Sequence, residues 1–333
     1  MAFESFEQIV QVCQEKSVSF AEAVIQEDMK DRLVTREATL EKMRYIWNSM
    51  LEAGRSYDEN RISTSGLVGG DGGRMSHYAD SGHTLCGNRM SRVIAQALQM
   101  GESNACMKRI VAAPTAGACG VLPAVLIPLF EETRQDCTSS APAAEASVLT
   151  EDDFVLSLFV AAGIGQVIAT RASIAGASGG CQAEIGSASA MAAGALVFLR
   201  GGSCDAIVQS AAMSLKNLLG LVCDPVSGLV EVPCVKRNVI GAVNAMSAAD
   251  MALAGIKSMI PADQVVDAMK EVGDLMDVSL RETGRGGLAA TTEAIEITKK
   301  FRESPSKNPF HSDPVHEHSR FINPTPFLRR GIF

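Results

Sequence analysis

The stretch FVLSLFVAAGIGQVIAT, residues 154–170, is the longest apolar run in the chain and decides the fold class. It includes two glycines and Gln166, and it falls short of the roughly 18 apolar residues that a membrane-spanning helix needs. Thr150 and Asp153, just before it, form a signature of a helix N-terminus. We therefore expect a helix buried in a protein core, and no membrane partner.

Helical patterns continue on both sides of this run. Ser19 to Glu22 has the spacing of a capping box, Thr35 precedes an amphipathic stretch around Trp47, and Gly54 is an expected helix stop. Alternating strand patterns are nearly absent, so the sequence predicts an all-α fold. Further helices are expected over residues 88–100, 104–112, 119–133, 151–170, 184–200, 204–219, 236–256 and 263–280.

Composition narrows the class of protein. The chain has 333 residues, 47% of them hydrophobic and 5% aromatic, with 29 glycines, which indicates a large core of small and aliphatic side chains. A net charge of −8 without a long basic block argues against a nucleic-acid partner. We expect one catalytic domain over residues 1–303, a surface linker near 136–147 and a proline-rich tail over 304–333.

Cysteine is the residue type most suited to carry the chemistry. Nine cysteines in an acidic chain without an N-terminal apolar leader predict a reducing cytoplasm, where thiols serve as ligands or nucleophiles. Cys181, Cys223 and Cys234 lie in or beside glycine- and proline-bearing loops, whereas Cys13 and Cys204 lie in helical segments and are interpreted as packing residues. The short paired spacings of a zinc site are absent, but an iron–sulfur cluster needs only thiolates that converge in space.

Long blocks of the sequence resemble the α chains of bacterial iron–sulfur-dependent L-serine dehydratases. The blocks are APTAGACGVLPAVL (113–126), GASGGCQAEIGSASAMAAGAL (176–196), CDPVSGLVEVPCVKRNVIGAVNAMSAADMALAG (223–255) and MKEVGDLMDVSLRETGRGGLAAT (269–291). The resemblance implies an all-helical catalytic domain in which Cys181, Cys223 and Cys234 hold a [4Fe-4S] cluster. The iron without a cysteine ligand would act as a Lewis acid on the hydroxyl of L-serine, giving pyruvate and ammonia in amino-acid degradation and gluconeogenesis.

The resemblance also implies partners. Members with separate chains have a β subunit that carries a regulatory domain, so we expect such a partner and an oligomer. In single-chain relatives a C-terminal cysteine approaches the cluster, but residues 304–333 contain no cysteine, so that contact is not expected here.

Two glycine-rich loops are candidates for binding the substrate. The loop around Thr115, Ala116 and Gly117 precedes a predicted helix, whose N-terminus can offer N–H groups to a carboxylate. The remaining candidates are Ser65, Gly69, Gly70 and Asp71 in the SGLVGGDGG segment, and Arg237 and Asn238 after Cys234. Glycines in such loops also serve turns and close helix contacts, and Arg237 and Asn238 also fit a helix start.

The sequence does not decide which residue is the general base. His77 and His83 follow the GGDGG segment, and histidine is the usual proton acceptor near neutral pH. Lys108 and Lys236 are alternatives if burial lowers their pKa.

Three other functions fit parts of the pattern. A cysteine desulfidase would use a similar cluster on a thiol substrate, and product analysis separates it from a serine dehydratase. A pyridoxal-phosphate dehydratase needs a Schiff-base lysine in an α/β fold, which the missing strand patterns oppose. A cluster-bearing redox sensor would bind partners without turning over serine.

Overall fold

The computed structural model describes residues 3–136, 149–303 and 321–322, and these form an all-α fold, as predicted. The N-terminal helices are α1 (Phe6–Lys16), α2 (Phe20–Arg32), α3 (Arg36–Arg55), α4 (Asp71–Asp80), α5 (Gly87–Ala105) and α6 (Val121–Asp136). The central ones are α7 (Glu151–Arg171), α8 (Gly176–Gly179), α9 (Ser187–Leu199), α10 (Cys204–Asn217) and α11 (Cys234–Leu253), followed by α12 (Ala262–Leu275) and α13 (Thr292–Glu303). Short helical turns are η1 (Gln182–Gly186), η2 (Val226–Gly228), η3 (Val278–Leu280) and η4 (Gly287–Ala290).

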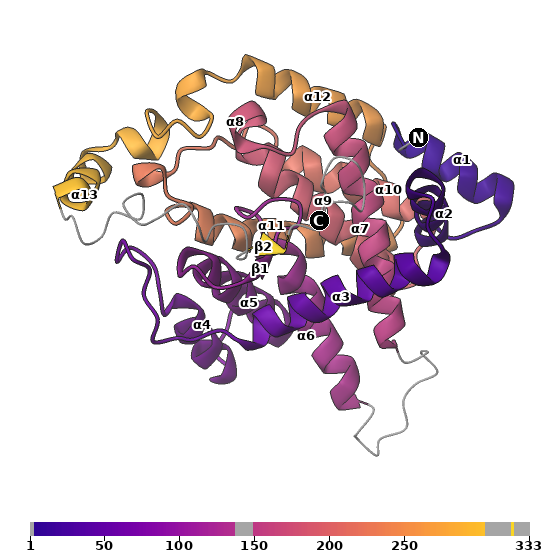
Figure 1. Cartoon of the computed structure of the whole chain (residues 1–333), viewed down its shortest axis with the longest axis horizontal. Helices are drawn as coiled ribbons and strands as arrows, with labels where there is room; N and C mark the ends of the chain where they lie inside the picture. Colours follow the sequence, from indigo (N-terminus) through magenta and orange to yellow (C-terminus); the bar gives the residue numbers. More distant parts are fainter. Residues whose placement is uncertain (1–2, 137–148, 304–320, 323–333) are drawn as a thin grey trace.

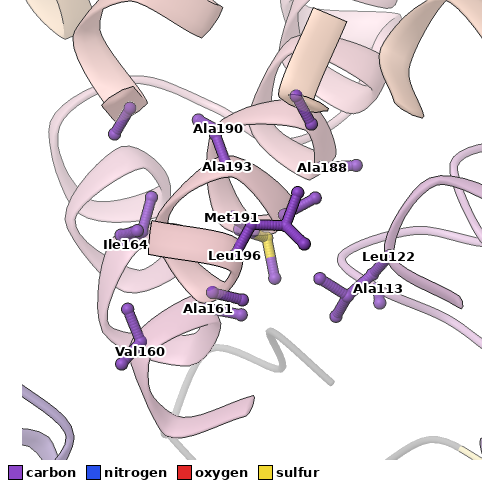
Figure 2. Close-up of a cluster of buried hydrophobic side chains, with 14 of the residues drawn as sticks. Ala113, Leu122, Val160, Ala161, Ile164, Ala188, Ala190, Met191, Ala193 and Leu196 are labelled. Atoms are coloured by element: carbon purple, nitrogen blue, oxygen red, sulfur yellow. The ribbon is translucent and has the colours of Figure 1, made fainter. Parts of the chain in front are cut away.

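Helix α9 lies at the centre of the molecule and packs against α7, α10 and α11, with α1 and α2 at one side and α13 at the other (Figure 1). Its side chains are small, and Figure 2 shows Ala190, Ala193 and Leu196 near Val160 and Ile164 of α7. Gly194 lets the two helices approach, because a Cβ there would collide with Ile164. A larger residue at this position would overpack the core, at a cost of about 1–3 kcal/mol.

An aromatic cluster joins α3, α6 and α7 within the core. Trp47 of α3 stacks on Phe154 of α7 with ring centroids 5.3 Å apart, and Phe130 of α6 meets the two rings edge-on. Such ring contacts stabilise the fold beyond the contribution from burying the three large rings. They join helices from both halves of the chain within the larger of the clusters of buried side chains.

The run that decides the fold forms the buried helix α7, and Thr150 and Asp153 make the predicted capping box. Two helical segments, Glu151–Arg171 and Gln182–Leu199, are long and apolar enough to cross a membrane, so length alone does not separate the alternatives. In the fold 78% and 89% of their apolar windows are buried by the protein itself. That burial is typical of core helices.

Several boundaries differ from the sequence expectation. Residues 104–112 are not a helix: α5 ends at Ala105, Met107 has φ 60°, and Ile110–Val111 form strand β1. β-branched residues before Pro114 favour this extended conformation. The helix expected over 263–280 ends at Leu275, because Met276 turns to an extended conformation.

Two helix signals also act differently from the expectation. Gly54 lies inside α3 and gives room to Ile127 of α6, whose Cδ1 would be 2.7 Å from an added Cβ. Ser19 caps α2, but the Glu22 side chain bonds to Gln26 and Arg36 and does not complete a capping box. Helix α4 begins within the segment that the sequence presents as a loop, and α13 is additional.

Strand β2 (Phe321–Ile322) pairs in parallel with β1 and is the described part of the proline-rich tail. The predicted linker lies almost wholly outside the described residues, and so does the rest of the tail. The domain boundary at residue 303 therefore stays a prediction.

Candidate metal centre

Three segments that are distant in the sequence bring Cys181, Cys223 and Cys234 together. Cys181 immediately precedes the π-helical turn η1, Cys223 lies in the loop before η2, and Cys234 is the first residue of α11. The Cys223 N–H donates to the carbonyl of Leu280 and its carbonyl accepts from Glu282, both at 2.8 Å, so a fourth segment holds this loop. The three cysteines are only 2%, 3% and 7% exposed.

Glu184 joins this cluster and is the residue that the sequence analysis missed. One of its carboxylate oxygens and the Sγ atoms of Cys181 and Cys223 all lie within 4.8 Å of one another. Glu184 follows Cys181 by three residues on one helical run, so both side chains lie on the same face. That spacing is the signal in the sequence that could have identified it.

Two glycines leave space for the Glu184 carboxylate. A Cβ on Gly176 would lie 2.7 Å from Glu184 Oε2 and 3.1 Å from Cys223 Sγ. A Cβ on Gly117 would lie 3.2 Å from Glu184 Oε1. The AGASGGC and APTAGACG loops therefore carry glycine at these positions because the acidic side chain and a cysteine thiol occupy the adjacent volume.

The thiols of the cluster have unequal pKa values. The hydrogen bond from Cys223 lowers the pKa of Cys181, and the Arg237 guanidinium, which also bonds to Cys181, lowers it further. Donating that bond and burial raise the pKa of Cys223, while burial raises the pKa of Cys234 to about 12. Cys181 is therefore the thiol most easily ionised among the three.

The Glu184 carboxyl is affected by the same burial. Removal from water raises its pKa to about 7, and the nearby Thr115 hydroxyl opposes the rise.

Arg237 connects the cysteine loops to each other. Its guanidinium forms an ion pair with Asp224 at 2.8 Å and donates to the carbonyl of Val222 at 2.7 Å. The second oxygen of Asp224 accepts from the N–H of Leu288 at 2.8 Å. This network fixes the residues on both sides of Cys223 against α11.

Asn238 ties the glycine-rich loop of residues 113–120 to the cysteine cluster. Its Oδ1 accepts from the Gly120 N–H at 2.8 Å, and its Nδ2 donates to the carbonyls of Gly117 and Cys234 at 2.8 and 3.0 Å. The side chain is 1% exposed and uses both polar atoms for these bonds. Asn238 therefore positions the loop and is committed to the protein backbone.

The donor set determines what the centre can bind. Three buried thiols with a cationic guanidinium beside them suit a soft metal centre, because thiolates are the preferred ligands of iron–sulfur clusters and of zinc. The chain matches the family model "Serine dehydratase alpha chain" over residues 15–289, which include every residue of this cluster. The chain belongs to this family.

Two relatives of the serine dehydratase α-chain family span nearly the whole chain. The "Probable L-serine dehydratase, alpha chain" of Bacillus subtilis is 43% identical and covers 90% of this chain and 95% of its own length. The "L-serine dehydratase, alpha chain" of Peptoniphilus asaccharolyticus is 40% identical, with 88% and 96% covered. The "L-serine dehydratase 1" of Escherichia coli is longer: it is 34% identical, and the match covers 86% of this chain and 61% of that protein.

These matches confirm the family resemblance drawn from the sequence blocks. Four of the residues predicted from the sequence lie beside the candidate metal centre. Thr115 and Gly117 contact Glu184, and Arg237 and Asn238 contact the cysteine segments. The N–H groups of Ala118, Cys119 and Gly120 bond to Thr115, Ala116 and Asn238. They are therefore not free to bind a carboxylate, and α6 begins only at Val121. The assignment of Thr115, Ala116 and Gly117 to substrate binding stays a prediction.

The SGLVGGDGG segment contacts residues that lie next to Cys234 in the sequence. Ser65 bonds to the buried Glu231 carboxylate, and Asp71 lies 3.3 Å from the Nζ of Lys236. Gly69 and Gly70 have φ of 143° and 80° and pack against backbone of residues 59–62. The N–H groups of Asp71 and Gly72 bond to the Glu102 carboxylate, so an internal anion already occupies the start of α4.

The two histidines lie on exposed surface. The His77 side chain is 71% exposed, with its Nε2 3.6 Å from Glu59, and His83 bonds to Ser81. Lys236 is 76% exposed, and Lys108 donates to the carbonyl of Ser56. Glu184 is the acid–base group that the structure brings to the cysteines.

Proposed function

We propose that this chain is the catalytic α chain of an L-serine dehydratase, which converts L-serine to pyruvate and ammonia. The observation that carries the proposal is the buried group of Cys181, Cys223 and Glu184, with the Cys234 thiol close enough to interact electrostatically with both other thiols. Membership of the serine dehydratase α-chain family supports the reaction.

The proposed cofactor is a [4Fe-4S] cluster held by the three cysteines. Their burial and the neighbouring Arg237 support this assignment, because the guanidinium offsets part of the negative charge of the thiolates. When bound, such a cluster has one iron without a protein thiolate, which supplies a Lewis acid for the serine hydroxyl without a change of redox state.

The remaining chemistry falls to the chain's own residues. Elimination of water from serine requires removal of the Cα proton, and a proton acceptor must reach that atom. We assign this role to Glu184 and not to His77 or His83, because its carboxylate oxygen lies within 4.8 Å of two proposed ligands while both histidines are exposed. Asn238 and Arg237 hold the loops that surround the substrate.

The Glu184→Gln substitution tests that assignment. The amide keeps the shape of the side chain but cannot accept the Cα proton, so kcat should fall by about 10²–10⁴-fold. Iron content should stay at the wild-type level. The matched control is Glu132→Gln on α6, whose carboxylate pairs with Arg89 and is not part of the cysteine–Glu184 group. Unchanged turnover in Glu184→Gln would remove Glu184 from the proton-transfer step, and loss of iron would make it a ligand.

The reaction is tested by anaerobic reconstitution. The purified chain is supplied with iron and sulfide, both are quantified, and pyruvate formation from L-serine is measured. Exposure to air should remove iron and turnover together. Sulfide release from L-cysteine without pyruvate from serine would favour a desulfidase, and a full cluster without either product would favour a redox-sensing or binding role.

The same proposal includes a β subunit and a cytoplasmic location. The relatives that this chain covers almost completely are named α chains, whereas the longer Escherichia coli protein is 61% covered. We infer that a second chain supplies the regulatory domain and that the two chains form an oligomer. Co-purification of the chain with a separately produced β subunit tests this.

All eight cysteines among the described residues are free thiols, which supports a reducing compartment.

A further inference from the structure

A second group of cysteines lies where α1, α2 and α10 meet. Cys13 is in α1 and is 5% exposed, and Cys204 is the first residue of α10 and is half-buried at the edge of the core. The two positions are far apart in the sequence, which is why the sequence analysis interpreted each one as a separate packing residue. Helix α1 packs against α10, and the Cys13 thiol lies within hydrogen-bonding reach of the Cys204 sulfur.

The two thiols form a hydrogen-bonded pair. The Cys13 thiol donates to the Cys204 sulfur, which raises the pKa of Cys13 and lowers the pKa of Cys204 from 9.0 to about 7. The Cys204 sulfur also accepts from the backbone N–H of Phe20 and from its own N–H. Phe20 and Cys204 are the first residues of α2 and α10, so both N–H groups belong to helix starts that lack intrahelical partners.

This environment differs from that of a cysteine used only for packing. A packed thiol in apolar surroundings stays protonated and inert, whereas a thiolate held by helix N–H groups is a nucleophile. Cys204 is partly open to solvent, and the buried Cys13 lies behind it. One cysteine is therefore placed for attack on a reagent from solution, and the other for resolution of the product.

We propose that Cys13 and Cys204 are a redox-active dithiol that low-molecular-weight disulfides such as oxidised glutathione convert to an intramolecular disulfide. The Cys204 thiolate attacks one sulfur of the reagent, whose S–S bond breaks and releases one thiolate. Cys13 then loses its proton to that thiolate and attacks the Cys204 sulfur, expelling the second half of the reagent. In total two protein thiols lose two electrons and two protons, and the reagent is reduced to two thiols.

The disulfide would fasten the N-terminal helices to α10. Crosslinking residues so distant in the sequence restricts the unfolded chain, so the oxidised protein should melt at a higher temperature than the reduced protein. None of the residues in this pair belongs to the metal centre, so the inference holds independently of the proposed function.

The experiment uses the full chain, purified anaerobically and incubated with oxidised glutathione. We expect the loss of two titratable thiols, a peptide map with Cys13 joined to Cys204, and a raised melting temperature. A thiol reductant should reverse all three changes, and the iron content should be unchanged. Absence of the Cys13–Cys204 peptide while other cysteines are modified would overturn the proposal.

Three variants separate the two steps. Cys13→Ser should stop at a mixed disulfide with one glutathione on Cys204, and Cys204→Ser should leave Cys13 unmodified. Cys86→Ser, which removes an exposed thiol before α5, is the matched control and should keep the crosslink. Equal glutathione uptake by Cys13 in the Cys204→Ser variant would contradict the assigned order of attack. If Cys13→Ser folds poorly, Cys13→Ala gives the same readout.

Discussion

The two cysteine groups of this protein use one side-chain type for different chemistry. Cys181, Cys223 and Cys234 are surrounded by charged side chains, with Arg237, Asp224 and Glu184 at close range. Cys13 and Cys204 face each other, and the hydrogen bond from Cys13, helped by two backbone N–H groups, lowers the pKa of Cys204. The first group offers three buried thiols beside an acidic side chain to which two glycines give room. The second group offers one partly exposed sulfur with a buried thiol next to it.

The difference shows what decides the fate of a thiol. Sequence context suggested that loop cysteines are functional and helix cysteines are for packing. The structure shows that the neighbours of the sulfur matter more. Cys204 is a helix cysteine, but its hydrogen bonds at the start of α10 lower its pKa to about 7.

Removal of a proposed ligand tests the comparison with the largest effect. Changing Cys181, Cys223 or Cys234 to Ser should reduce bound iron to background and abolish serine turnover, because an alcohol is a poor ligand for iron that prefers thiolate. Iron and sulfide quantification with a pyruvate assay measures both. Cys13→Ser is the control and should keep its iron and its turnover. A full cluster in any of the three ligand variants would remove that residue from the ligand set.

Filling the space beside the ligands should have the next largest effect. Gly176→Ala places a Cβ against Glu184 and Cys223, so the side chains must shift. We expect a loss of about 10–100-fold in kcat or iron affinity, as for other residues that orient ligands. Gly186→Ala is the matched control, since its nearest foreign atom would be at 3.7 Å, an ordinary contact. Equal activity in both variants would show that the space beside Glu184 and Cys223 at Gly176 is not needed.

Loss of the Asn238 amide should have a moderate effect. Asn238→Ala leaves the Gly120 N–H and two carbonyls without their partner, which should lower the free energy of unfolding by about 2–4 kcal/mol. Urea denaturation measures the loss, and the Cys13–Cys204 crosslink should still form. Asn60→Ala, in an exposed loop, should change the free energy of unfolding by less than about 0.5 kcal/mol. A similar value for both variants would contradict the role of Asn238 in fixing the loop.

The smallest effect concerns the reactivity of Cys204. Only the thiolate is alkylated, so the rate with iodoacetamide should rise with pH and reach half of its plateau near pH 7. Cys13→Ser should shift this midpoint, since the strongest hydrogen bond to the sulfur changes. Mass spectrometry of the Cys204 peptide over pH 5–10 gives the profile. A midpoint close to the ordinary value of 9.0 would place Cys204 among the packing cysteines.

The all-α fold and the family could be predicted from the sequence, because the run at 154–170 and the long blocks are strong signals. The length of the run did not distinguish a core helix from a membrane helix, and only the packing of α9 shows why it is buried. The helix predicted over residues 104–112 was wrong, because β-branched residues and Pro114 override the weak helical pattern. The prediction that Gly54 ends a helix was wrong, because in the sequence a glycine that gives room to a neighbouring side chain looks the same as one that ends a helix.

The candidate site was only partly predictable. The three cysteines lie in the family blocks, but Glu184 lies in a run of small residues and its role depends on Gly176 and Gly117, which are distant or in another loop. Local sequence does not report such packing. His77 and His83 were chosen by residue type, whereas exposure, a property of the whole fold, separates them from the cysteines.

The π-helical turn η1, directly after Cys181, makes chain length at this point a determinant of chemistry. Such turns often arise as one inserted residue within an α-helix and occur often at functional sites. Deleting one residue between Gln182 and Gly186 would turn the Cys181 side chain by about 100° about the helix axis relative to α9. Cys181 would then face another direction and lose its place beside Cys223. The number of residues in this turn therefore sets where the Cys181 thiol points, alongside the identity of Glu184 within it.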